Sequence, residues 1–310
     1  MNRIINSYTE GKNGPLLIVF GAMHGNEAAG VKAIEEVFNL IQEEPKKNPN
    51  FSFYGKLVGL IGNLKAYQKG VRFLTKDMNR HFSKQHVKWI FSAPKQQLDE
   101  EDEEIKGIIN TIHNEINTYK PTKLYILDLH TTSAQGGIFT IPSADYESVQ
   151  IALDIHVPVV EGMLDGIKGT TLHFFNTQNM NIETTAVTFE AGQHDDPESV
   201  KNAVSALINC LRAVGCVDRK NIEEKHNNRL YLMSRDLPSR TRLIHRYAVT
   251  PEENFKMQPG FKNFQLVEKD TLLATNKFGE IRNTEKARVL MPLYQPQGED
   301  GFFLVKDILS

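Results

Sequence analysis

The stretch LLIVFGAMHGNEAAG, residues 16–30, decides the fold class that the sequence predicts. Its first part, Leu16 to Phe20, is apolar and rich in β-branched and aromatic residues, which is typical of a short buried strand. A glycine-containing turn follows, and then an apolar pattern at helical spacing predicts a helix that stops at Pro45. His24 and Glu27 lie in the turn, at the carboxyl end of the strand, where open α/β folds keep their functional sites.

His24 and Glu27 form half of a candidate metal site. Imidazole and carboxylate are both zinc ligands, and catalytic zinc takes three protein ligands and an open position. His130 is the candidate third ligand, because it directly follows the apolar run Lys123 to Leu129, which predicts a strand ending at the same sheet edge. Asp128 lies on the same face of that strand and can accept a hydrogen bond from a ligand imidazole.

The bulk composition excludes several classes of protein. The chain has 310 residues, a formal net charge of −2 and 2 cysteines, Cys210 and Cys216. The near balance of charge gives no reason to expect nucleic acid or an anionic membrane as a partner. No run approaches the ~18–20 apolar residues of a membrane span, the start lacks a signal-peptide pattern, and one cysteine pair is no disulfide framework. We therefore expect a cytoplasmic protein whose metal ligands are histidines and carboxylates.

Strand and helix patterns alternate through the first part of the chain. Further strands are expected at residues 56–61, 123–129, 137–141, 156–160 and 186–190, and helices over 99–119 and 197–214. This alternation predicts an α/β fold, with a mixed central sheet and helices on both of its faces. The acidic run at 99–104 is interpreted as a helix start rather than a cation site, because acidic residues favour a helix N-terminus.

The pattern changes after Cys216. A polar, charged segment at residues 218–229 is predicted to be a linker, and from Leu230 onward short β-type runs alternate with turn signals. The sequence therefore predicts two domains. Residues 1–217 form the domain that carries the candidate metal site, and residues 218–310 form a smaller all-β domain that can cap it.

Glu190 is the candidate general base. It ends the apolar run AVTFE, and a carboxylate with a buried approach has a raised pKa, which suits a group that takes and later returns a proton. A surface glutamate at a turn is the alternative interpretation. Arg72, Asn79 and Arg80 lie in the non-periodic segment GNLKAYQKGVRFLTKDMNRHF, and an arginine fork can bind a carboxylate or stabilise an oxyanion. Solvated surface arginines are the alternative there.

Four strings in the chain resemble a known family. GAMHGNEAAG, GVRFLTKDMNRHF, LDLHTTS and TFEAGQ occur in that order, and they are similar to the succinylglutamate desuccinylase/aspartoacylase family, a branch of the zinc-carboxypeptidase-like hydrolases. The β-rich region that follows is similar to the family's C-terminal domain. The resemblance implies a zinc-carboxypeptidase-like fold, one Zn²⁺ per chain at His24, Glu27 and His130, and hydrolysis of the amide bond of a small N-acyl amino acid. Assembly into a homo-oligomer is left open.

The resemblance also implies roles for further residues. Glu190 corresponds to the general acid/base, and Arg72 to the arginine that polarises the scissile carbonyl. Asn79 and Arg80 correspond to the pair that holds a substrate carboxylate. Tyr294 corresponds to a tyrosine that the C-terminal domain lends to the pocket.

One segment departs from the family pattern. Aspartoacylase-like members carry a carboxylate-binding arginine shortly before the catalytic glutamate, whereas residues 176–181 read NTQNMN. Losing that side chain weakens selection for a carboxylate and counts against N-acetylaspartate as the substrate, unless Lys168 or His173 compensates. Two other functions stay open: a metallocarboxypeptidase acting on peptides, and a ligand-binding protein without catalysis.

Overall fold

The computed structural model describes residues 1–218 and 224–308. The strands are β1 (Ile4–Tyr8), β2 (Leu16–Gly21), β3 (Lys56–Ile61), β4 (Leu124–Thr132), β5 (Phe139–Pro142), β6 (Val159–Glu161), β7 (Thr184–Gln193), β8 (Arg240–Ala248), β9 (Lys256–Met257), β10 (Gln265–Val267), β11 (Leu272–Asn276), β12 (Gly279–Arg282), β13 (Ala287–Leu290) and β14 (Asp300–Asp307). The strands expected near 56, 123, 137, 156 and 186 are confirmed, with ends that shift by a few residues.

The helices are α1 (Ala29–Lys47), α2 (Leu64–Lys69), α3 (Lys84–Ser92), α4 (Glu100–Tyr119), α5 (Tyr146–Asp154), α6 (Met163–Gly166), α7 (Thr171–Phe174), α8 (Thr177–Met180), α9 (Pro197–Ala213) and α10 (Lys225–Ser234), with short 3₁₀ helices η1 (Met78–Arg80), η2 (Lys95–Gln97) and η4 (Pro251–Glu253). The acidic run does start a helix, since Asp99 caps α4 in a capping box with Asp102. Among the described residues, no helix is long and apolar enough to cross a membrane.

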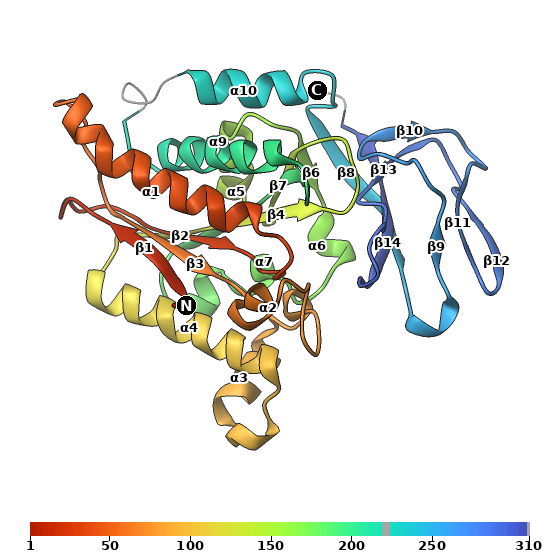
Figure 1. The fold of residues 1–310 in the computed structure, drawn as a ribbon, viewed down its shortest axis with the longest axis horizontal. Coiled ribbons are helices and arrows are strands. Elements are labelled where there is room, and N and C mark those ends of the chain that lie inside the picture. Colours follow the sequence, from red (N-terminus) through yellow and green to blue (C-terminus); the bar gives the residue numbers. More distant parts are fainter. Residues whose placement is uncertain (219–223, 309–310) are drawn as a thin grey trace.

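A mixed sheet of 11 strands runs through the described residues in the order β1-β3-β2-β4-β7-β5-β6-β8-β14-β13-β10 (Figure 1). Its central strands β3, β2, β4 and β7 are parallel, whereas β5 pairs antiparallel with β7. The carboxyl ends of the parallel strands therefore meet at one edge of the sheet, as the sequence predicts for a site built on strand ends.

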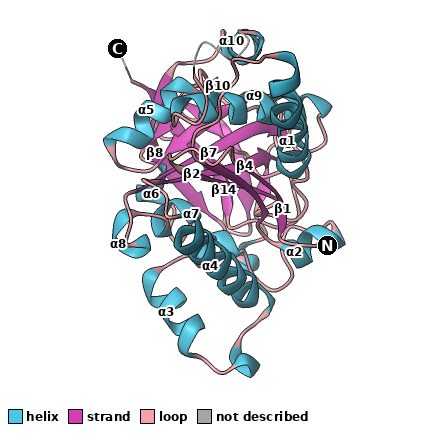
Figure 2. Cartoon of the chain, turned by 90° about the vertical axis from the view of Figure 1, so that its left-hand side faces the viewer, coloured by secondary structure: helices cyan, strands magenta, loops and turns pink. Residues whose placement is uncertain are grey.

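Helices cover both faces of the sheet (Figures 1 and 2). Strand β2 shows why, because its side chains point alternately to the two faces and all of them are buried. Leu17 and Val19 join a core with α1 and α9, while Leu16, Ile18 and Phe20 join a second core with α4. The predicted α/β fold with a mixed central sheet is confirmed.

The predicted end of the first helix is wrong. Helix α1 continues through Pro45 and ends at Lys47. A proline removes one backbone hydrogen bond of a helix, but only the last, solvent-exposed turn follows Pro45 here, so the loss is small.

The predicted linker at 218–229 is partly helical. Residues 219–223 lie outside the described part of the chain, but α10 begins at Lys225 and includes the 230–234 segment that was expected to start the β-type runs. Leu230 is fully buried in the α1–α9 core, and Arg229 donates to Asn202 of α9 at 3.1 Å. Packing against α9 therefore selects a helix for this segment, whatever its local preference.

The C-terminal β runs form strands as expected, and they extend the central sheet. β8 pairs in parallel with β6, and β14 pairs antiparallel with β8. A separate 3-stranded sheet, β12-β11-β9, lies at the far end (Figure 1). Alternate side chains of β14 enter different cores: Phe302 and Leu304 pack in a small C-terminal core, whereas Phe303 and Val305 pack in the α4-side core. The boundary between residues 217 and 218 stays a prediction.

Candidate metal centre and active site

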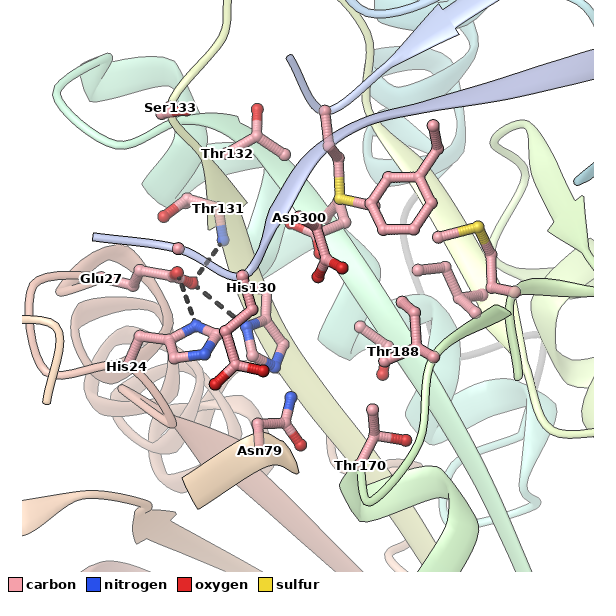
Figure 3. A pocket seen from close by; sticks show the side chains of 18 of the residues that line it. His24, Glu27, Asn79, His130, Thr131, Thr132, Ser133, Thr170, Thr188 and Asp300 are labelled. Atoms are coloured by element: carbon pink, nitrogen blue, oxygen red, sulfur yellow. Dashed lines mark hydrogen bonds and ion pairs between the residues drawn. The ribbon is translucent and has the colours of Figure 1, made fainter. Parts of the chain in front are cut away.

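His24, Glu27 and His130 converge at the carboxyl edge of the sheet. One potential ligand atom from each residue lies within 4.8 Å of the others, and all three side chains are buried. The Nδ1 atom of His24 lies 2.8 Å from Glu27 Oε1, and the Nδ1 atom of His130 lies 3.2 Å from Glu27 Oε2 (Figure 3). Both imidazoles thus point the same ring nitrogen at one carboxylate, as in a site where three side chains share one cation.

The turn that carries His24 and Glu27 depends on a close approach of backbone at Gly25. A Cβ atom there would lie 2.2 Å from the carbonyl carbon of Ala66 and 2.5 Å from the carbonyl oxygen of Val71, so only glycine fits. The amide of Gly25 also donates to the carbonyl of Arg72 at 3.0 Å. The turn therefore packs directly on the segment that carries Arg72.

Each imidazole has a second carboxylate behind it. Nε2 of His24 lies 3.1 Å from Asp77 Oδ1, and Nε2 of His130 lies 3.1 Å from Asp128 Oδ2. Asp128 is itself held by the hydroxyl of Thr171, which donates to it at 2.6 Å. A carboxylate on the outer ring nitrogen orients a ligand histidine and increases its basicity. Asp128 was expected in this role, but Asp77 was not, although it lies only three positions before Arg80.

The acidic surroundings fit a bound cation. Although burial acts to lower the pKa of His130, its contacts with Asp128 and Glu27 raise that pKa well above the usual value. Although burial acts to raise the pKa of Glu27, the charges of His24 and His130 hold it well below the usual range. The raised pKa of His130 shows that positive charge is favoured at this point, and a metal ion at the three ligand atoms can supply that charge.

Glu190 lies beside the metal-ligand group. Its Cα pairs with that of His130 across β4 and β7, so the two side chains occupy neighbouring positions on the same face of the sheet. Burial raises the pKa of Glu190 to about 8. Its Oε2 atom is buried and has no hydrogen-bond partner among the described residues. A buried carboxyl with a free oxygen and a raised pKa can accept and return a proton near neutral pH.

The metal-ligand group and Glu190 line a cavity, and Arg72 and Asn79 line it too. Nη2 of Arg72 donates to Asp77 at 2.9 Å, Nη1 lies 3.5 Å from Glu27 Oε1, and Nε is buried without a partner among the described residues. The side chain of Asn79 points toward the two histidines, and its oxygen accepts from the amide of Thr171 at 2.9 Å (Figure 3). An unpartnered guanidinium N–H at this place can donate a hydrogen bond to a substrate oxygen.

Arg80 lines the cavity but already has an acidic partner. Its Nη2 lies 2.5 Å from Asp300 Oδ2, at the start of β14. The turn after Arg80 is shaped by Gly169, which has φ +70° and would bring a Cβ atom within 2.1 Å of the carbonyl oxygen of Arg80. Sequence reasoning missed Asp300, since nothing local to a strand start 220 positions away links it to Arg80.

Tyr294 does not belong to the residues that line the cavity of the metal-ligand group; it lines a neighbouring outer pocket. Its hydroxyl donates to the carbonyl of Gln258 at 2.8 Å and accepts from the amide of Phe261 at 2.9 Å. Lys168 and His173, the two candidates to compensate for the missing arginine, are also absent from the described residues that line the cavity. Nδ1 of His173 instead contacts the hydroxyl of Thr170 at 2.8 Å.

The cavity is small, with a volume of about 120 Å³. The C-terminal part of the chain supplies one side of it, through Met291, Leu293, Gln295 and the segment Gly298–Asp300. Gln295 also reaches Nε2 of His194 at 3.2 Å, and the other ring nitrogen of His194 contacts Thr131 at 2.7 Å. Sequence reasoning assigned no role to His194 or Gln295, whose contact connects the C-terminal segment to the strand end that carries His130.

Comparisons with known proteins identify the family of this chain. The family model described as the succinylglutamate desuccinylase/aspartoacylase catalytic domain matches residues 13–214. A probable aspartoacylase of Nostoc sp. is 28% identical over 126 residues, which are 40% of this chain and 37% of that protein, so the match spans well under half of the relative's length.

Solved structures share the fold over nearly the whole chain. A succinylglutamate desuccinylase from Vibrio parahaemolyticus has a TM-score of 0.64 at 13% identity, and the superposition covers 96% of this chain and 83% of the desuccinylase chain. Murine aminoacylase 3 has a TM-score of 0.58 at 13% identity, with 96% of both chains covered. At such identities the likeness concerns the fold, but the family model matches well over half of the sequence. The chain belongs to the succinylglutamate desuccinylase/aspartoacylase family.

Proposed function

We propose that the protein is a zinc-dependent amidohydrolase that removes the acyl group from a small N-acyl amino acid. The observation that carries this proposal is the convergence of two histidine Nδ1 atoms on Glu27 beside Glu190, a buried carboxyl with an unpartnered oxygen. Family membership supports the same type of reaction.

His24, Glu27 and His130 would hold one Zn²⁺. A zinc ion bound by three side chains with an open position supplies a water of lowered pKa and a Lewis acid for the scissile carbonyl. Asp77 orients His24 through a hydrogen bond to its outer nitrogen, and the carboxylate of Asp128 lies at ion-pair distance from the outer nitrogen of His130.

Glu190 carries the proton in the proposed mechanism. It takes a proton from the attacking water as the new C–O bond forms at the amide carbon. It then gives that proton to the nitrogen as the C–N bond breaks, so that a carboxylic acid and a free amine leave. Its buried position suits both steps, because the protonated and ionised forms are closer in energy there than in water.

The remaining residues orient the substrate in this proposal. Arg72 donates from its unpartnered Nε to the carbonyl oxygen on which negative charge develops. Asn79 and Arg80 hold the substrate carboxylate. The part of Tyr294 in substrate binding stays a prediction from the family resemblance.

A peptidase is the second candidate function, with the same catalytic atoms. The small volume of the cavity and the C-terminal residues on one side of it, including Gln295, favour a small substrate over a polypeptide. We also propose the cytoplasm as the compartment, since Cys210 and Cys216 are buried free thiols.

The test is an amide-hydrolysis assay of the purified protein after metal removal and after zinc is restored. The substrates are N-acyl amino acids and unblocked tripeptides. We expect zinc to restore release of free amine from the N-acyl amino acids, with little cleavage of the tripeptides. Faster cleavage of the tripeptides would favour the peptidase, and zinc binding without hydrolysis of either class would favour a ligand-binding protein.

A further inference from the structure

The cavity contains an apolar group of side chains besides the catalytic residues. Five lining side chains are apolar and buried: Ile141, Met163, Ile167, Leu172 and Phe303. They come from β5, α6 and its flank, α7 and β14, so that both the central and the C-terminal parts of the sheet contribute. Burial of an apolar substrate group against these side chains is favourable. A charged group in the same place would lose its hydration without gaining a partner.

Arg80, the lining arginine beyond Arg72, is largely occupied by the protein's own groups. Its Nη2 contacts Asp300 at 2.5 Å and its Nη1 donates to the carbonyl of Asn79 at 2.8 Å. Only Nε is buried without a partner among the described residues. Nε of Arg80 can therefore donate to an acidic oxygen of the substrate, but with Nη2 held by Asp300 the side chain does not present the open two-pronged fork that binds a carboxylate most tightly.

The charges around Arg80 are unfavourable for further negative charge. Asp300 lies across the cavity from His24 and Glu27 (Figure 3). Glu299, the preceding residue, also lines the cavity. Apart from the two histidines of the metal-ligand group, Arg72 and Arg80 are the basic side chains among the described lining residues, and Arg72 is held by Asp77 at 2.9 Å. A second substrate carboxylate would either lie unpaired or have to displace Asp300 from Arg80, and both cost affinity.

We infer that the substrate has a single carboxylate and an otherwise uncharged, apolar body, and that Asp300 is the residue that excludes a second carboxylate. This inference rests on the proposed deacylase function. The protein should therefore hydrolyse N-acyl amino acids with one carboxylate in preference to compounds with a second one, such as N-succinyl amino acids and N-acyl aspartates.

Four matched substrates test the inference: N-butanoyl-leucine, N-succinyl-leucine, N-butanoyl-aspartate and N-succinyl-aspartate. Butanoyl and succinyl have the same carbon chain, so the pairs differ in charge rather than length. We expect kcat/KM of the zinc enzyme to be about 100-fold higher for N-butanoyl-leucine than for each of the other three. An equal or higher value for any of the three would overturn the inference.

Two variants test the role of Asp300. Asp300→Asn leaves Arg80 free to pair with substrate, and we expect the preference for butanoyl over succinyl to fall about tenfold, mainly through a lower KM for the succinyl compound. Arg246→Gln is the matched control, because Arg246 contacts the other oxygen of Asp300 at 2.5 Å but does not line the cavity. An unchanged preference in a folded Asp300→Asn protein, or the same loss in Arg246→Gln, would overturn the assignment to Asp300.

Binding measurements keep this inference separate from the proposed function. Isothermal titration of the zinc-loaded Glu190→Gln protein ranks the four compounds without turnover. Tightest binding of N-butanoyl-leucine supports the substrate class even if the wild-type protein hydrolyses none of them, a result that would count against the deacylase function alone. No binding, or tighter binding of a dicarboxylic compound, would overturn the substrate class.

Discussion

Two regions of the chain enclose the same cavity, but their residues reach it in different ways. The first region is formed by the carboxyl ends of β2, β4 and β7, and the second is the segment that leads into β14. His130 and Glu190 lie near the ends of paired parallel strands, and His24 and Glu27 lie in the turn that directly follows β2, so the pairing of neighbouring strands brings all four to one edge of the sheet. Asp300 meets Arg80 across 220 positions, through antiparallel strands added to the far side of the sheet. The first region carries the proposed chemistry, and the second limits what can enter. We therefore expect changes in the first to affect metal content and rate, and changes in the second to affect substrate preference.

The largest effect is expected from His24→Ala. It removes a proposed ligand and leaves Glu27 buried without its closest imidazole, so zinc measured by elemental analysis after dialysis should fall from about one ion per chain to almost none. His113→Ala, on the exposed side of α4, is the control and should retain zinc. Full zinc occupancy in His24→Ala would rule out the proposed ligand set.

Glu190→Gln should keep its zinc and lose activity. The amide of glutamine fills the same space but cannot carry the proton, so kcat should fall about 1000-fold. Glu183→Gln, at an exposed position just before β7, is the matched control and should change kcat little. Near-wild-type activity of Glu190→Gln would show that another group moves the proton.

Glu190→Gln should also change how the stability of the metal-free protein depends on pH. Burial raises the pKa of Glu190 to about 8 from an unfolded value of 4.5, so the folded state holds a proton that the unfolded state has released. The stability contribution of this group is present below the unfolded pKa and is lost as pH rises through about 8, with a slope of at most about 1.4 kcal/mol per pH unit. Urea unfolding should show this loss in the wild-type protein, and Glu190→Gln should lack that component. Identical pH dependence of the two proteins would contradict the assignment.

Asp128→Asn should weaken zinc binding without abolishing it. Asparagine retains the shape but loses the charge behind His130, and such changes reduce metal affinity by about 10- to 100-fold. Asp300→Asn is the matched control, because Asp300 lies in the second region and its substitution should change zinc affinity less than about twofold. Competition with a chromogenic chelator measures both, and a similar loss in the two variants would mean that the regions are not separable.

The smallest effect is expected from Tyr294→Phe. The tyrosine hydroxyl already bonds the backbone of Gln258 and Phe261, so its loss should lower the free energy of unfolding by about 1 kcal/mol and change kcat/KM less than about twofold. A tenfold or larger fall in kcat/KM would instead support the substrate role that the family resemblance implies.

Local sequence patterns predict the positions of the metal-ligand group well and the structure of the segments around it poorly. His130 and Glu190 could be placed because each ends an apolar run, and parallel strand ends share an edge. The helix at 225–234 could not be predicted, because its apolar residues 230–233 are consecutive rather than at helical spacing, and it is the packing of Leu230 in the α1–α9 core that selects the helix. Asp77 had a local signal, an acidic residue beside Asn79 and Arg80, but its contact with His24 across 53 positions required the folded chain.

By itself the sequence determined the α/β fold class, the central strands and the side chains that converge at their carboxyl ends. These follow from periodicity and burial, which act over short distances along the chain. Tertiary structure alone decided that Asp300 pairs with Arg80, that Tyr294 bonds to backbone and that Gln295 contacts His194. Those contacts join residues far apart in the chain, and the energy of each depends on burial and charge that arise only when the C-terminal strands add to the sheet.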